Sequence, residues 1–298
     1  MASEYPSDDV EAFVHSGARV FDKYAVERLR PLCSLPKWRG EIDGDEPSGP
    51  GSLKNVHFNE SASGALAVWK LNENDSEMRL LDRYLVVVDV GGRSLSADWS
   101  VIAVFDRAPM REGRGPEIVA QWRGHTDFDL LAWNAARIAT FYDNALLVIE
   151  SNTLETRDPF RSIDGDQTSF LLNQLRDHYI NLYARQRNEE DIRRGTPVKY
   201  GFHTNMATKP MIIATLVKVI REGGYTERDE QCLTEFLTYE QRPNGSFGAL
   251  PGHHDDLLMT RAIGLHISFA EMEMPKIRER GEGLRFYHGY FPDSAGAF

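Results

Sequence analysis

The segment Tyr84-Leu85-Val86-Val87-Val88-Asp89 is the most informative part of the chain, because it is a short apolar run that ends in an acid. A continuous apolar run of this length is typical of a central strand that is covered on both faces. An unpaired carboxylate is costly to bury, so an acid at the end of a buried strand usually has a compensating cation. The stretch therefore predicts a central strand whose end binds a positive charge.

The segments that follow this strand predict a β-β-β-α-β order. Residues 84–90, 100–105 and 117–122 have the composition of strands and form an antiparallel meander. Residues 128–142 have helical periodicity, and residues 145–150 form the next buried strand. Because a crossover through one helix ordinarily returns beside the starting strand, we expect this last strand next to the first. The fold class is α/β.

The remaining periodic segments predict further helices and turns around this sheet. The expected helices are residues 168–177, 209–222, 228–236 and 255–272, and Gly223-Gly224 would stop the second of them. Hairpins are expected within residues 53–72 and 238–250, and the charged residues 185–194 are expected to form a solvated loop.

Residues 1–52 are interpreted as an N-terminal arm or linker, and residues 53–298 as one domain. A short helix is expected over residues 8–22, with Ser7 as its cap. Residues 41–51 are rich in Asp, Glu, Gly, Pro and Ser, which is typical of a loop.

Composition bounds the possible partners. The chain has 298 residues, a formal net charge of −11, 41% hydrophobic and 27% charged residues, which fits a soluble globular protein. No apolar run approaches the roughly 18–20 residues of a membrane span, and no signal peptide is recognisable. Two cysteines give no disulfide framework, so an intracellular location is expected. The acidic charge argues against coating nucleic acid through bulk charge, but not against an enzyme that acts on DNA.

Two further acidic sites resemble Asp89 in their placement. Glu150 ends the apolar run 145–149, and Asp255 and Asp256 follow a histidine pair and open the last helix. Each has an ordinary alternative role, as a turn cap, an exposed strand end or a helix N-cap. Jointly they supply hard oxygen ligands from separate elements, which Mg²⁺ and Mn²⁺ prefer. Two such ions would suit phosphodiester hydrolysis.

Four other residues are candidates for a supporting role. Asp98 is either a weak ligand or a loop-end acid. His253 and His254 could donate to a phosphate or act as a base, or could be ordinary loop histidines. Lys209, at the start of a helix, could meet a phosphate or be solvated.

Three motifs carry a resemblance to a known family. In chain order they are Val88-Asp89-Val90-Gly91-Gly92 with Ala97-Asp98-Trp99-Ser100 after it, then Val148-Ile149-Glu150-Ser151-Asn152, then Gly252-His253-His254-Asp255-Asp256-Leu257-Leu258-Met259. Over roughly residues 53–272 the chain resembles the nuclease domain of phage terminase large subunits. That resemblance implies an RNase H-like fold, a mixed central sheet flanked by helices. The opening segment, residues 4–21, resembles the exit from the ATPase domain of these proteins.

The resemblance implies a metal-dependent endonuclease that cleaves concatemeric viral DNA during genome packaging. Asp89, Glu150 and one or both of Asp255 and Asp256 would hold one or two Mg²⁺ or Mn²⁺ ions, and the family pattern leaves the main ligand of the adjacent pair open. The implied partners are double-stranded DNA, an ATPase domain, the portal and the small terminase subunit. The implied location is the cytoplasm of the infected bacterial host, at the procapsid.

One departure and three rival interpretations accompany this expectation. The sequence contains no Gly-x-x-x-x-Gly-Lys-Ser/Thr motif, so ATP hydrolysis is not expected of it. Asp89-Val90-Gly91-Gly92-Arg93-Ser94 resembles the first phosphate loop of an actin/sugar-kinase-like nucleotide-binding domain, but Glu150-Ser151-Asn152-Thr153 supplies no second one. Another RNase H-like nuclease, such as a junction resolvase, is the second rival. The third is a docking module that binds portal or small-subunit proteins through its acidic surface.

Overall fold

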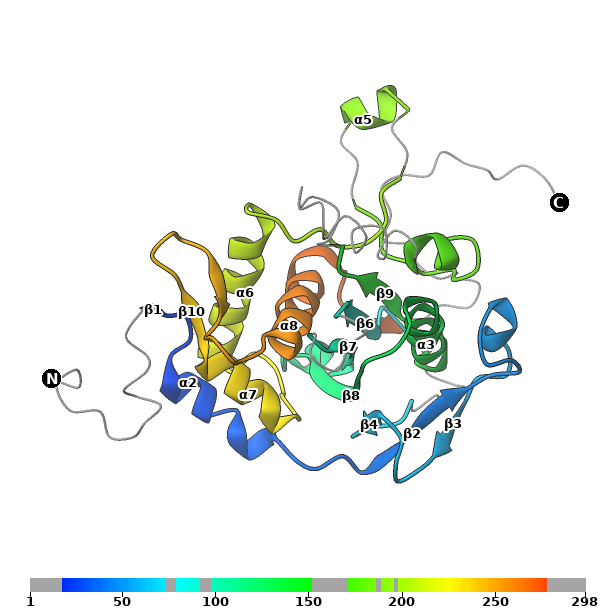
Figure 1. Ribbon diagram of the computed structural model, residues 1–298, viewed down its shortest axis with the longest axis horizontal. Coiled ribbons are helices and arrows are strands. Elements are labelled where there is room, and N and C mark those ends of the chain that lie inside the picture. Colours follow the sequence, from blue (N-terminus) through cyan, green and yellow to red (C-terminus); the bar gives the residue numbers. More distant parts are fainter. Residues whose placement is uncertain are drawn as a thin grey trace, which may run out of the picture.

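The computed structural model describes residues 18–72, 79–91, 98–151, 171–185, 189–195 and 198–277. Its centre is a seven-stranded sheet with the strand order β3-β2-β4-β8-β7-β6-β9 (Figure 1). The strands of this sheet are β2 (Trp38–Asp43), β3 (His57–Glu60), β4 (Leu66–Val68), β6 (Tyr84–Asp89), β7 (Ser100–Asp106), β8 (Glu117–Gly124) and β9 (Leu146–Ile149). Neighbouring strands are antiparallel except β6 and β9, which are parallel.

The connectivity of the sheet defines its fold class. Strands β6, β7 and β8 form the predicted meander, and α3 (Phe128–Phe141) then leads to β9 beside β6. Beyond β9 the chain adds further parallel bridges, Leu147 with Leu182 and Glu150 with Phe202. A three-stranded meander whose first strand pairs in parallel with a strand reached through one helix is the arrangement of the RNase H-like fold. The predicted α/β, RNase H-like class with a mixed central sheet is therefore confirmed.

Helices cover both faces of the sheet, and the alternation of side chains along β6 shows why. Leu85 and Val87 belong to a core under α2 (Lys23–Glu27), α6 (Thr208–Glu222), α7 (Glu230–Leu237) and α8 (Asp256–His266). Val86 and Val88 belong to the opposite core, under α3 and the helical residues 171–175 (Figure 1). Because successive side chains of a strand point to opposite faces, a continuous apolar strand is needed for this two-sided burial.

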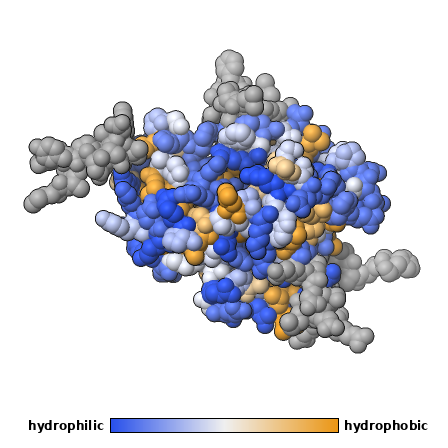
Figure 2. Space-filling view, turned by 90° about the horizontal axis from the view of Figure 1, so that it is seen from below, coloured by the Kyte–Doolittle hydropathy of each residue, from blue (hydrophilic) through white to orange (hydrophobic). Residues whose placement is uncertain are grey.

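Smaller elements complete the described structure. They are β1 (Ala18–Arg19), β10 (Tyr239–Gln241) and β11 (Phe247–Ala249) in one sheet, β5 (Leu80–Leu81) paired with β12 (Lys276–Ile277), α5 (Glu189–Arg193), the 3₁₀ turns η1 (Arg30–Leu32), η2 (Pro50–Leu53) and η3 (Ala108–Glu112), and the π-helical η5 (Ile267–Glu271). Among the described residues, no helix is long and apolar enough to cross a membrane. The face in Figure 2 is mostly hydrophilic, with scattered apolar groups, which is usual for a surface in water.

The N-terminal part differs from the sequence-based expectation. Strand β2 pairs with both β3 and β4, and α2 packs against α6 and α7, so the chain contributes to the common fold from residue 18 onward. Strand β1 lies where the end of the helix over residues 8–22 was expected, and residues 8–17 are outside the described part. The likeness of the opening segment to an ATPase exit stays a prediction.

Two other local expectations are corrected. The hairpin expected within residues 53–72 does not form, because β3 and β4 lie on opposite edges of β2 instead of pairing with each other. The expected loop 185–194 contains α5. The helix expected over residues 168–177 is described only from residue 171, and the one expected over 255–272 is α8 followed by η5.

Candidate metal centre

Asp89 and Glu150 lie side by side at the ends of two parallel strands. The register pairs Val88 of β6 with Ile149 of β9, and the backbone N–H of Glu150 donates to the Val88 carbonyl at 2.9 Å. The next residue of each strand is the acid. Because carboxyl ends of parallel strands meet at the same edge of a sheet, the two acids are neighbours there.

Both acids face the side of the sheet that α8 covers. Val87 of β6 and Val148 of β9 belong to the core under α8, together with Leu257 of that helix. Asp89 and Glu150 are each two residues further along their strands, and side chains two residues apart share a face. The strand pattern therefore directs both carboxylates toward the start of α8.

Helix α8 brings the second pair of acids to the same place. Asp256 is its first residue and is 5% exposed, and the half-buried Asp255 precedes it. The backbone N–H of Trp99, the residue before β7, donates to Asp256 Oδ2 at 3.3 Å. Gly91 lets the backbone of Asp98 and Trp99 pack closely against the end of β6, because a Cβ at Gly91 would lie 2.2 Å from the Asp98 carbonyl oxygen.

Burial, followed by the charges of neighbouring acids, raises the pKa values of Asp89, Asp255 and Asp256. Burial raises the pKa of Asp89 well above its usual range, and the charge of Glu150, a hydrogen bond with Glu150 and the charges of Asp256 and Asp255 add to this. Burial also raises the pKa of Asp255, which Lys209 opposes, and raises the pKa of Asp256 to about 6 together with the Asp98 charge. The fold thus holds four acids together at an electrostatic cost.

The residues present fit a divalent cation. Glu150 is 4% exposed, and its Oε1 is buried with no hydrogen-bond partner within the described part of the chain. Such an oxygen is normally satisfied by a ligand, a water or an ion. The converging groups are hard carboxylate oxygens, which suit Mg²⁺ or Mn²⁺.

Three of the four supporting candidates lie at the rim of this cluster. Lys209 Nζ is 4.0 Å from Asp255 Oδ2. His254 Nδ1 is 3.4 Å from Asp98 Oδ1 and 3.9 Å from Asp256 Oδ2, and ligand atoms of these three residues lie within 4.8 Å of one another. Asp98 itself is highly exposed. His253 is exposed too and is not part of that group.

Two residues next to the cluster were not predicted. Glu235 of α7 is 6% exposed, accepts a hydrogen bond from the Leu258 N–H at 2.8 Å, and has its pKa raised to about 8, mainly by burial. Tyr239 is buried with Lys209 Nζ 5.9 Å from its ring centroid, and burial, then the charges of Asp255 and Glu150, raise its pKa. The sequence feature that could have identified Glu235 is its position as an acid on the apolar face of a helix.

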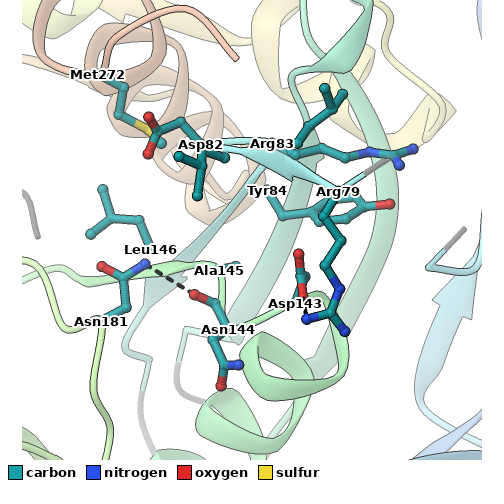
Figure 3. A pocket seen from close by; sticks show the side chains of 12 residues that line it. Arg79, Asp82, Arg83, Tyr84, Asp143, Asn144, Ala145, Leu146, Asn181 and Met272 are labelled. Carbon is teal, nitrogen blue, oxygen red and sulfur yellow. Dashed lines mark hydrogen bonds and ion pairs between the residues drawn. The ribbon is translucent and has the colours of Figure 1, made fainter. Parts of the chain in front are cut away.

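A small cavity lies at the opposite end of the same strands (Figure 3). It has a volume of about 30 Å³, and Tyr84 at the start of β6 and Leu146 at the start of β9 line it with Asp82 and Asn181. This is about the space that one water molecule needs. The cavity is therefore separate from the acid cluster, which forms at the carboxyl ends of β6 and β9.

Comparisons with known proteins give structural likenesses. No family model matches the chain, and no curated protein matches it. The large terminase nuclease from thermophilic phage G20c with bound magnesium has a TM-score of 0.49 and 16% identity, over 83% of this chain and 95% of that one. The Thermus phage P74-26 large terminase nuclease domain has a TM-score of 0.46 and 17% identity, over 88% and 99%. The Mn-soaked, inhibitor-bound human cytomegalovirus terminase nuclease domain has a TM-score of 0.41 and 10% identity, over 84% and 96%.

Proposed function

We propose that this chain is a divalent-metal-dependent endonuclease that hydrolyses DNA, acting as the nuclease part of a large terminase. The observation that carries the proposal is the convergence of four acids on one face of the sheet. Asp89 and Glu150 end adjacent parallel strands, and Asp255 and Asp256 open the helix packed over them. A fold tolerates such repulsion when the cluster binds a cation.

The proposed roles follow from the position of each group. Asp89, Glu150, Asp255 and Asp256 would hold one or two Mg²⁺ or Mn²⁺ ions on rigid strand and helix ends. When bound, such ions polarise a phosphoryl oxygen and make water more acidic.

The rim supplies hydrogen-bond donors to a phosphodiester. The Lys209 ammonium and the His254 ring lie beside the acids and can donate to phosphate oxygens, and a carboxylate can orient a water for attack.

The proposed substrate, partners and location rest on the order of the three sequence motifs. The substrate would be double-stranded, concatemeric viral DNA, and an ATPase domain would translocate it. Portal and small terminase subunit would be the other partners, in the cytoplasm of the infected bacterial host. The net charge of −11 is compatible with this substrate, because acids that repel phosphate on their own attract it once they hold cations.

A nucleotide-binding domain of the actin/sugar-kinase type is disfavoured. Strand β9 ends at Ile149 and is followed by Glu150, whose charge raises the pKa of Asp89, whereas that interpretation needs a phosphate-binding loop at this place. Calorimetry with Mg-ATP checks this point, and no heat of binding is expected. Parallel assays on branched and linear DNA distinguish a junction resolvase, which would prefer the branched substrate.

Plasmid cleavage with Mn²⁺ tests the proposed activity. The parent protein should nick and linearise supercoiled plasmid, whereas Asp89→Ala and Asp256→Ala should not. Asp129→Ala is the matched control, because Asp129 is an exposed acid in the first turn of α3. If both site variants cut as fast as the parent, the site is wrong. If the folded parent cuts nothing, a docking module with a vestigial site becomes the better account.

A further inference from the structure

The first turn of α8 is capped from another helix. Asp255 occupies the N-cap position with φ −131° and ψ 16°, yet its side chain makes no capping hydrogen bond. An aspartate there ordinarily accepts from the second or third N–H of its helix. Here the third one, the N–H of Leu258, donates to Glu235 Oε2 at 2.8 Å.

Glu235 is held rigidly for this task. It lies on the buried side of α7 beside Cys232 and Phe236. The N-cap of α7 is Asp229, which accepts from the Gln231 N–H at 3.0 Å. The Asp229 carboxylate also accepts from Gln121 of β8 at 2.6 Å, which ties the start of α7 to the sheet.

In this arrangement neither Asp255 nor Asp256 uses its carboxylate to cap α8. Asp255 Oδ2 lies 4.0 Å from Lys209 Nζ, and Asp256 Oδ2 accepts from the Trp99 N–H. A carboxylate that caps its own helix directs an oxygen back to the backbone, and that oxygen is then a poorer cation ligand. Capping by Glu235 removes this competition.

We propose that Glu235 is a positioning residue for the metal centre: it caps α8 in place of Asp255, so that Asp255 and Asp256 stay turned toward the cation. The inference rests on the proposed function only in taking that cation to be the divalent metal. Without Glu235, Asp255 at the N-cap position would accept from the Leu258 N–H, as an N-cap aspartate ordinarily does, and it would turn away from the site to do so.

Two substitutions separate the hydrogen bond from the charge. Glu235→Gln keeps an acceptor, and Glu235→Ala removes it. Mn²⁺ affinity is measured by calorimetry on the full chain at a temperature where circular dichroism shows each variant to be folded. Removal of a group that orients metal ligands typically weakens binding about 10–100-fold. We expect a weakening of at least about tenfold for Glu235→Ala and less than about threefold for Glu235→Gln.

Asp22→Ala is the matched control, because Asp22 caps α2 by accepting from the Ala25 N–H at 2.8 Å and is not one of the acids of the cluster. It should lower stability and leave Mn²⁺ affinity unchanged. Equal Mn²⁺ affinity of the parent and Glu235→Ala would overturn the inference, as would equal weakening in Glu235→Ala and Glu235→Gln.

Hydrogen exchange at the first turn of α8 provides a readout that does not depend on the metal. Exchange of the Leu258 amide should be faster in Glu235→Ala than in Glu235→Gln, and equal rates would also overturn the inference. A further outcome is that the parent binds no Mn²⁺ while the Leu258 amide still exchanges faster in Glu235→Ala than in Glu235→Gln. That result would contradict the proposed function and the metal-positioning role, but it would leave Glu235 as the cap of α8.

Discussion

Arg261 and Glu227 form an ion pair in which neither side chain is exposed. Arg261 Nε and Nη2 each lie 2.9 Å from a carboxylate oxygen of Glu227, and Arg261 Nη2 also donates to Gln121 Oε1 of β8 at 2.7 Å. The pair joins the middle of α8 to the sheet and to the segment before α7. The position of the helix that carries Asp255 and Asp256 therefore depends on a buried charge pair.

Removal of one member of this pair should be severely destabilising. Glu227→Gln leaves Arg261 buried without its counter-charge, and we expect a loss of about 3–5 kcal/mol in the free energy of unfolding. Urea denaturation at pH 7 measures it. Glu112→Ala serves as the control, because Glu112 pairs with Arg114 on the exposed surface, and it should leave the denaturation midpoint unchanged. Equal midpoints for the two variants would contradict a structural role for the buried pair.

The same pair should make stability depend on acid pH. Burial opposes ionisation of Glu227, but Arg261 outweighs it and holds the pKa of Glu227 below its usual value of 4.5. The folded state therefore binds fewer protons than the unfolded state, and the stabilisation is present above pH 4.5 and lost as the pH falls through the folded pKa. Urea midpoints measured from pH 6 to pH 3 should fall more steeply for the parent than for Glu227→Gln.

Asp89→Asn should stabilise the metal-free protein while abolishing cleavage. The folded pKa of Asp89 is raised, so its ionisation opposes folding, and stability is lost as the pH rises from the ordinary pKa through the folded one. In EDTA, the melting temperature of the parent should therefore drop more between pH 5 and pH 9 than that of Asp89→Asn. A parallel pH dependence of the two proteins would show that Asp89 carries no electrostatic strain.

Binding of a divalent metal should offset the destabilisation that the ionised acids cause in the parent protein. A ligand that binds only the folded state at 100 times its Kd stabilises by about 2.7 kcal/mol. Thermal melts in rising Mn²⁺ should move to higher temperature for the parent and stay constant for Asp89→Asn and Asp256→Asn. EDTA should restore the original melt. A similar shift in all three proteins would place the bound ions elsewhere.

Close packing of α8 on β7 can be tested at Gly264. A Cβ at this position would lie 2.4 Å from ring atoms of Phe105, so Gly264→Ala should overpack the core and cost about 1–3 kcal/mol. Urea denaturation and Mn²⁺ titration of the same samples would show whether displacing α8 also weakens the metal site. The double variant Gly264→Ala with Phe105→Leu makes room for the methyl group and should recover most of the loss.

The central sheet and the acid cluster were predictable because both have local signatures. The apolar runs before Asp89 and Glu150 predicted two buried strands, and one helix between them predicted that they would be neighbours. The histidine pair before Asp255 and Asp256 marked the start of the last helix. The structure brings these acids together, while their role as metal ligands stays a prediction.

Long-range pairing explains most of what the sequence did not indicate. Strand β2 ends within a polar stretch that resembles a loop, and it is a strand because β3 and β4 supply partners on both of its edges. Glu235 and Leu258 are joined only by the packing of α7 on α8. His253 and His254 are adjacent in sequence, and only the folded loop distinguishes them.

The contact between Trp99 and Asp256 joins residues that lie 157 positions apart. During synthesis, the segments that carry Asp89 and Glu150 emerge from the ribosome before α8 has been made. The nascent chain thus carries half of the acid cluster and cannot assemble the rest until α8 docks. For a protein with the proposed activity, the order of synthesis itself delays the appearance of a DNA-cutting site until α8 has been made.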